Sequence, residues 1–154
     1  SYGSAKRWYP DKFAQVAEDL SPNYDIIIFG GQDEVNLASD IEKLLIAKKV
    51  KNYKNLAGKT TIKELITRIS SLDLFITTDS GPMHLAASFQ IPTVAVFGPT
   101  NPNETSQWKM KNSIIVKKNL GCQPCMKRAC PLKHHNCMQL LEPSDVLEAV
   151  KVLN

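Results

Sequence analysis

Residues 74–89 of the chain read LFITTDSGPMHLAASF. A run of β-branched and aromatic residues comes before Asp79, and an apolar stretch of helical spacing follows Pro82. Proline suits the first turn of a helix, because its missing N–H would have no partner there and its φ is already fixed. The stretch therefore predicts a buried strand, a tight turn at 79–81 and a helix from Pro82 to about Phe89.

The rest of the chain repeats this alternation of strand and helix. Strands are expected at 25–30, 53–57, 74–78, 93–97 and 113–116, and helices at 10–20, 34–49, 62–69, 82–89 and 144–153. Strict alternation predicts right-handed crossovers and a parallel sheet with helices on both faces. We therefore expect an α/β fold, a doubly wound Rossmann-like layer.

The composition is that of one cytoplasmic globular domain. With 154 residues, 43% of them hydrophobic, the chain is able to bury a core without disulfides. It has no apolar run of about 18 residues, and its first residues lack the pattern of a signal peptide. Because the chain opens with a loop, residues 1–8, where a doubly wound unit normally has a strand, we expect a strand upstream and a longer protein.

The turn after the 74–78 strand is the first candidate binding element. A helix start carries unpaired backbone N–H groups and the positive end of the helix dipole, so the turn at 79–81 is a potential anion site. His84 falls in the first helical turn, where a phosphate would favour its doubly protonated form. The alternative is an ordinary capped helix with a half-buried histidine.

Two further loops would face the same edge of the expected sheet. Ser4 and Lys6 precede the first helix, and a lysine there is able to reach a phosphate. Asp33 follows the 25–30 strand, where a carboxylate accepts hydrogen bonds from ribose hydroxyls, although it is equally a plain helix cap. Together the three loops predict a crevice for a nucleotide or a nucleotide sugar.

Several motifs stand along the chain: Lys6-Arg-Trp with Pro10, Gly30-Gly31, Leu56-Ala-Gly58-Lys-Thr60, Asp79-Ser-Gly-Pro-Met-His84-Leu-Ala, Phe97-Gly-Pro-Thr100-x-Pro102 and the segment from Cys122 to Cys137. They occur in the order found in bacterial ADP-heptose:lipopolysaccharide heptosyltransferases. Over nearly its whole length the chain resembles the C-terminal half of these two-domain GT-B glycosyltransferases. The resemblance implies that residues 1–154 are a single domain that binds the donor ADP-L-glycero-β-D-manno-heptose. It implies that the N-terminal domain, which holds the lipid A-core acceptor, is absent from this chain.

The resemblance also implies roles for single residues. Lys6, with Ser4 beside it, contacts the donor phosphates, and Asp33 or Glu34 binds the ribose, while Thr60 lies where the adenine wall would be. The diphosphate and sugar are wrapped by the stretch Asp79, Ser80, Gly81, Pro82, Met83 and His84. No residue matches the general base of the family, so the chain alone should bind the donor without turning it over.

Positive groups at the diphosphate would stabilise the negative charge that grows on the leaving ADP. No Asp-x-Asp pair occurs in the sequence, so a Mg²⁺ ion bridging the phosphates is not indicated, and the family needs no metal for donor binding. We expect no cofactor, no metal, no nucleic acid and a monomer. If the acceptor is a lipid A precursor, Lys117, Lys118, Lys127, Arg128 and Lys133 would give peripheral contact with the inner face of the cytoplasmic membrane.

The four cysteines leave alternatives open. Cys122 and Cys125 form a zinc-like pair, but the spacings to Cys130 and Cys137, with His134 and His135 between them, match no standard zinc motif. Zinc, disulfides and free thiols all stay possible. So do two other functions: a GT-B transferase or epimerase that uses a different nucleotide, and a non-enzymatic zinc module whose basic segment contacts nucleic acid.

Overall fold

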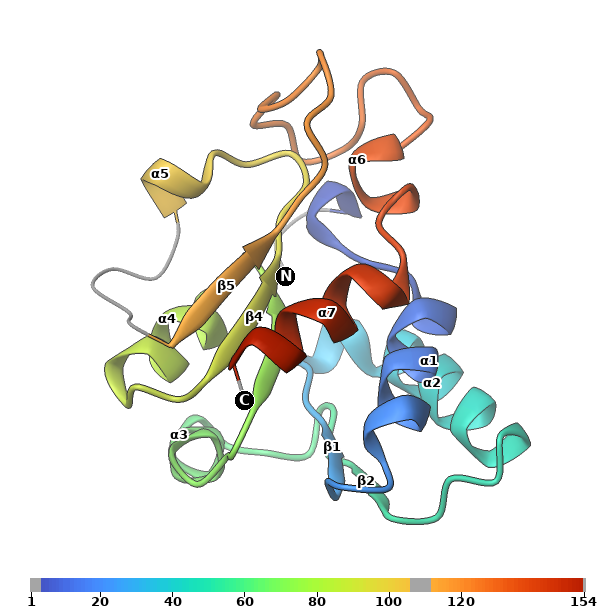
Figure 1. The fold of residues 1–154 in the computed structure, drawn as a ribbon. Coiled ribbons are helices and arrows are strands. Elements are labelled where there is room, and N and C mark those ends of the chain that lie inside the picture. Colours follow the sequence, from blue (N-terminus) through green and yellow to red (C-terminus); the bar gives the residue numbers. More distant parts are fainter. Residues whose placement is uncertain (1–3, 106–111, 154) are drawn as a thin grey trace. The chain divides into compact units, whose positions relative to one another are not determined.

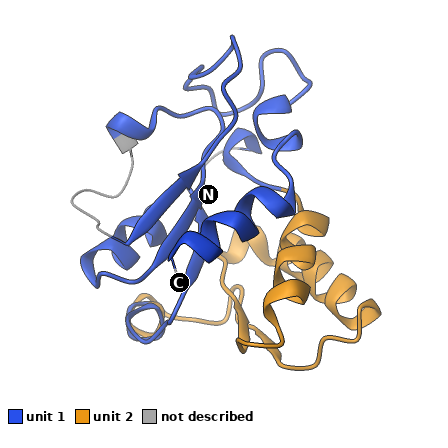
Figure 2. Ribbon diagram, in the orientation of Figure 1, with its two compact units in different colours: residues 1–8, 66–154 blue, residues 9–65 orange. Residues whose placement is uncertain are grey.

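The computed structural model describes residues 4–105 and 112–153 (Figure 1). The chain divides into two compact units, one of residues 1–8 and 66–154 and the other of residues 9–65 (Figure 2). Both units combine helices with parallel strands. Each unit is described by itself below.

The unit of residues 9–65 is built around two short parallel strands. Its elements are α1 (Pro10–Leu20), β1 (Ile26–Ile28), the 3-10 helix η2 (Gln32–Glu34), α2 (Val35–Ala47), β2 (Tyr53–Asn55) and the start of α3 (Ile62–Ser70). Ile27 of β1 lies opposite Lys54 of β2. Small side chains at Ala14 and Ala38 let α1 and α2 pack closely together, and Leu45 completes the buried core.

The other unit holds three parallel strands in the order β3-β4-β5. Its elements are η1 (Ser4–Lys6), β3 (Phe75–Thr78), α4 (Gly81–Ser88), β4 (Thr93–Val96), α5 (Pro102–Thr105), β5 (Ser113–Val116), α6 (Asn136–Gln139) and α7 (Pro143–Leu153). In register, Thr78 lies opposite Val96, which lies opposite Val116. The carboxyl ends of the three strands therefore meet at one edge of the sheet.

The central strand β4 is covered on both faces, which is why all four of its residues are buried. Ala95 and the adjacent Phe97 pack with Met83 of α4 on one face. Because side chains alternate along a strand, Val94 and Val96 point to the other face, where α7 packs against β4 and β5. Figure 1 shows α4 and α7 on opposite sides of this sheet. The result is a helix–sheet–helix sandwich that fixes the start of α4 at the carboxyl edge.

The predicted α/β class with parallel strands and the order of its main elements are confirmed. One difference concerns the sheet: within the described residues, strand pairing forms a two-stranded and a three-stranded sheet rather than one continuous layer. Periodicity along the sequence reports the burial of each strand, not which strands become neighbours. A second difference is that α4 begins at Gly81, one residue before the predicted Pro82. None of the helices in residues 4–105 and 112–153 has the length and apolar character needed to cross a bilayer.

Candidate functional site

The turn after β3 is shaped by hydroxyl groups rather than by a conventional helix cap. Thr77 and Thr78 are buried, and Ser80 occupies the cap position of α4 with extended backbone. The Ser80 hydroxyl lies 3.2 Å from Oγ1 of Thr77 instead of capping the helix. The first-turn N–H groups are therefore not occupied by the side chain that usually takes them.

The start of α4 has open space in front of it. A Cβ added to Gly81 would meet no described atom within 4 Å. The positive end of the helix dipole and the first backbone N–H groups point out of this start, which is the arrangement that binds phosphate groups in other proteins. His84 is exposed on the first turn, so the half-buried histidine of the alternative interpretation is not observed.

Pro82 and Met83, two other predicted ligand residues on α4, differ in how deeply they are buried. Pro82 occupies the second helical position and is half-buried. The side chain of Met83 is fully buried in the core with Ala95 and Phe97, and its N–H donates to the Ser80 carbonyl. Met83 therefore anchors the helix to the sheet.

An ion pair joins η1 to this turn. Nζ of Lys6 lies 3.2 Å from Oδ2 of Asp79, and the two side chains are 25% and 5% exposed. Oδ2 accepts no hydrogen bond from the residues that the structure describes, so the contact is electrostatic. Taking a carboxylate out of water costs several kcal/mol unless a cation compensates it, and Lys6 supplies that cation. An ammonium carries three N–H donors, so Lys6 keeps capacity for a phosphate.

The position of Lys6 depends on a distant part of the chain. We call residues 119–137 the cysteine loop. The buried Ala5, next to Lys6, donates its N–H to the Arg128 carbonyl at 2.9 Å and accepts a bond from Nε2 of His135 at 2.7 Å. Farther along, the indole N–H of the buried Trp8 donates to the Leu141 carbonyl at 3.3 Å. Ser4 opens η1 and is exposed.

Two polar residues near this edge were not assigned roles from the sequence. Thr77 orients the Ser80 hydroxyl, as described above. Thr100 follows β4 and is 6% exposed, and its Oγ1 has no hydrogen-bond partner among the described residues. The motif Phe97-Gly-Pro-Thr100 was visible in the sequence, but only the structure shows that the hydroxyl is buried without a partner.

The remaining predicted ligand residues belong to the unit of residues 9–65. There the loops after β1 and β2 lie side by side, because the Gly58 N–H donates to the Gly30 carbonyl and the Gln32 amide donates to the Gly58 carbonyl. Gly58 has a φ of +70°, and a Cβ there would lie 2.7 Å from a methyl group of Val35, so the turn requires glycine.

Asp33, Glu34 and Thr60 flank these two loops. Glu34 accepts a hydrogen bond from the Gly31 N–H at 3.3 Å, which closes the start of η2, whereas Asp33 is exposed. Thr60 is half-exposed, two residues after Gly58. These three residues share the carboxyl edge of the β1–β2 sheet. Their participation in one site with Lys6 and α4 stays a prediction.

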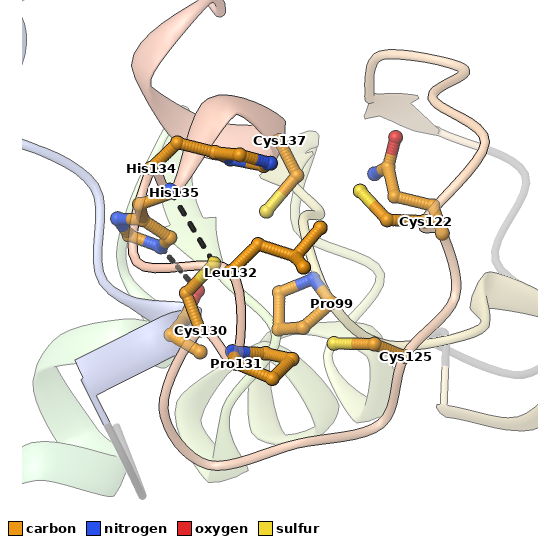
Figure 3. Close-up of a pocket in the computed structure, with 11 residues that line it drawn as sticks. Pro99, Cys122, Cys125, Cys130, Pro131, Leu132, His134, His135 and Cys137 are labelled. Atoms are coloured by element: carbon orange, nitrogen blue, oxygen red, sulfur yellow. Dashed lines mark hydrogen bonds between the residues drawn. The ribbon is translucent and has the colours of Figure 1, made fainter.

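The cysteine loop surrounds a pocket lined by all four cysteines, both neighbouring histidines, Pro99 and Leu132 (Figure 3). All four thiols are free. Within the described ranges, no three Cys, His, Asp or Glu side chains are grouped as ligands of one metal ion. Hydrogen bonds from backbone N–H groups, that of His135 first, lower the pKa of Cys130, while burial raises the pKa of Cys137 to about 11.

The sequence matches the model of glycosyltransferase family 9 (heptosyltransferase) over residues 1–136. The chain belongs to this family. It is 50% identical over 154 residues to a lipooligosaccharide heptosyltransferase 2 of Campylobacter jejuni, covering 99% of this chain and 48% of that protein. A lipopolysaccharide heptosyltransferase 2 of Salmonella typhimurium is 29% identical, with 99% of this chain and 44% of that protein covered. The family 9 chain thus spans about half the length of the curated relatives it matches.

Solved structures agree with the family assignment. The structure of Escherichia coli ADP-heptose lps heptosyltransferase II has a TM-score of 0.81 and 25% identity, over 99% of this chain and 43% of that chain. E. coli heptosyltransferase WaaC with ADP shares the fold, with a TM-score of 0.77 at 16% identity. The predicted resemblance to the heptosyltransferases and to their GT-B architecture is confirmed.

Proposed function

We propose that this chain is the donor-binding domain of a heptosyltransferase that transfers heptose from ADP-heptose to the inner core of lipopolysaccharide. The observation that carries the proposal is the ion pair between Lys6 and the buried Asp79 beside the open start of α4. It fixes a cation next to the start of α4, where the Gly81 N–H and the helix dipole favour an anion such as a diphosphate. The family assignment supports heptose as the sugar and ADP as the nucleotide.

The arrangement suits the chemistry of the leaving group. Cleavage of the bond between sugar and diphosphate leaves negative charge on ADP, and fixed donors lower the barrier when they point at that charge. Lys6, the Gly81 N–H and the exposed His84 supply these donors. Gly81 carries no side chain, so a phosphate is able to approach the backbone directly. Thr100 adds a buried hydroxyl at the same edge of the sheet, in the loop after β4, the strand next to β3.

The contacts to the nucleoside end of the donor rest on the family resemblance. The resemblance points to Asp33 or Glu34 for the ribose hydroxyls and to the loop carrying Thr60 for the adenine. The acceptor and the general base belong to the part of the protein outside these 154 residues. The chain by itself is then a binding domain without turnover.

The acceptor also suggests a surface that contacts the membrane. Lys127, Arg128 and Lys133 are exposed on the cysteine loop, beside Met126 and Leu132, which are 47% and 58% exposed. Basic residues contribute on the order of 1 kcal/mol each at an anionic bilayer. Lys109, in the same basic segment, lies outside the described residues. We place the complete protein at the cytoplasmic face of the inner membrane, held in part by this surface.

Vesicle sedimentation tests the membrane contact. The complete protein should bind vesicles containing anionic lipid at low salt and be released near physiological ionic strength. Replacement of Lys127, Arg128 and Lys133 by Gln should remove this binding. Equal sedimentation of the variant and the wild type would show that these charges only keep the loop soluble.

Calorimetric titration of the complete protein with ADP and with UDP tests the donor assignment. ADP should bind and UDP should not, and His84→Ala should weaken binding of ADP-heptose by about 1.5 to 3 kcal/mol, as for a lost hydrogen bond to a charged group. Because His84 is exposed, the variant should keep its fold by circular dichroism. Preference for UDP would point instead to another nucleotide-sugar enzyme of the same architecture.

A further inference from the structure

The cysteine loop holds both backbone groups of Ala5. The Ala5 N–H donates to the Arg128 carbonyl, and the Ala5 carbonyl accepts from the His135 ring at 2.7 Å. Ala5 is 2% exposed and directly precedes Lys6. The backbone on which Lys6 stands is therefore fixed by residues more than 120 positions away in the sequence.

The loop is itself anchored to the three-stranded sheet. The Gln123 side-chain amide donates to the Gly98 carbonyl at 2.8 Å, and the Met126 N–H donates to the Pro99 carbonyl at 2.8 Å. A Cβ at Gly98 would lie 3.0 Å from Sγ of Cys137, so the glycine lets the end of the cysteine loop pack against this turn. The loop thus links the turn after β4 to η1.

His135 is fixed at both ends. A carbonyl oxygen only accepts hydrogen bonds, so Nε2 of His135 must carry the proton that it gives to Ala5. The backbone N–H of His135 donates to Sγ of Cys130 at 3.4 Å, and both bonds are drawn in Figure 3. The residue has a left-handed φ of 54°, a conformation that Asn also tolerates well.

We propose that His135 is a positioning residue for the donor site: through Ala5 it holds η1 so that Lys6 stands beside Asp79 at the start of α4. This inference rests on the proposed function, because the effect on a ligand passes through Lys6. His135 does not touch the ligand. The cysteine loop then serves as the support of the phosphate site and is distinct from the groups that bind the phosphate.

A double-mutant cycle on the complete protein tests the inference, with calorimetric ADP affinity as the measurement. His135→Asn shortens the side chain while tolerating the left-handed backbone, so the ring bond to Ala5 is lost. We expect the Kd for ADP to rise about 3- to 10-fold, as for one lost hydrogen bond. In a Lys6→Met background the same change should have no further effect, because its route to the ligand is already gone.

Two other variants separate positioning from general damage. His135→Gln keeps a side-chain donor of similar reach and should restore most of the affinity. His134→Asn is the matched control, since the His134 ring accepts from the Asn136 N–H and is not bonded to Ala5. It should bind ADP like the wild type.

The outcomes are distinguishable. If the wild type does not bind ADP, the proposed function fails. If Lys6→Met weakens binding but His135→Asn does not, or if His135→Asn weakens binding equally in both backgrounds, the positioning role is overturned. If His135→Asn does not fold, full ADP affinity in a folded His135→Ala variant would overturn it as well.

Discussion

The turn after β3 and the cysteine loop belong to the same compact unit, yet different kinds of contact hold them in place. In the turn, Thr77 and Met83 each contact Ser80, all within seven residues of the sequence. In the cysteine loop, His135 reaches Ala5 across 130 positions. The turn is specified by its own residues, whereas the loop is specified by partners that the fold brings to it. The turn that would bind the ligand is thus formed by residues close in sequence, whereas the segment that supports it is held by residues far away in sequence.

The largest expected effect is a difference in alkylation rate between two thiols of the cysteine loop, Cys130 and Cys137, because thiols react as thiolates. Backbone N–H donors, that of His135 first, lower the pKa of Cys130, and burial raises the pKa of Cys137 to about 11, with the neighbouring cysteines adding to the shift. At about pH 8 the thiolate fraction of Cys137 is therefore well below that of Cys130. Peptide mass spectrometry after brief iodoacetamide treatment should find Cys130 labelled before Cys137.

The pH profile sharpens this prediction. Labelling of Cys130 should level off as pH rises through its lowered pKa, while labelling of Cys137 should keep rising towards about pH 11. Identical profiles for the two cysteines would contradict the environments described for them.

The ion pair should give the next largest effect. Lys6→Met leaves Asp79 buried without its cation, so the free energy of unfolding should fall by about 2 to 3 kcal/mol. The expected loss is smaller than the loss on breaking a fully buried ion pair, because the Lys6 side chain is 25% exposed. Urea denaturation measures the loss, and ADP affinity should fall as well.

A second substitution separates stability from binding. Lys6→Met combined with Asp79→Asn removes the uncompensated charge, so stability should recover while ADP affinity stays low. The matched control Lys151→Met removes an exposed lysine of α7 and should change neither quantity. Recovery of ADP affinity in the double variant would show that Lys6 is only a structural partner of Asp79.

Two glycines provide a smaller contrast between binding and folding. Gly81→Ala meets open space, so stability should be unchanged, but the new methyl group lies in the path of a phosphate and should weaken ADP binding about tenfold. Gly58→Ala should instead destabilise the protein by more than about 1 kcal/mol, because its φ is +70° and Val35 is in the way. Thermal unfolding and ADP titration of both variants measure these effects. If Gly81→Ala binds ADP as tightly as the wild type, the predicted contrast is contradicted.

Much of the fold was predictable because it is local. The strand–turn–helix at 74–89 was visible from β-branched residues, Pro82 and helical spacing, and the structure places β3 and α4 there. Lys6, Asp79 and His84 were singled out from their places in the predicted strand-to-helix loops, and their part in binding stays a prediction. The Lys6–Asp79 contact spans more than 70 positions, so its distance and its burial came only from the structure.

Other features were not accessible from the sequence for stated physical reasons. Met83 was grouped with ligand residues, but its side chain is core, since an apolar residue at a helix start gives no sign of which way it faces. The buried hydroxyl of Thr100 and the bond from His135 to Ala5 depend on tertiary packing. The division of the strands into two sheets also depends on pairing that periodicity does not encode.

The most direct test of the central claim is a crystal structure of the complete protein with ADP. The account predicts the diphosphate at the start of α4, within hydrogen-bond distance of the Gly81 N–H and of Nζ of Lys6, with Lys6 still beside Asp79. A diphosphate bound elsewhere, with the start of α4 left to solvent, would contradict it.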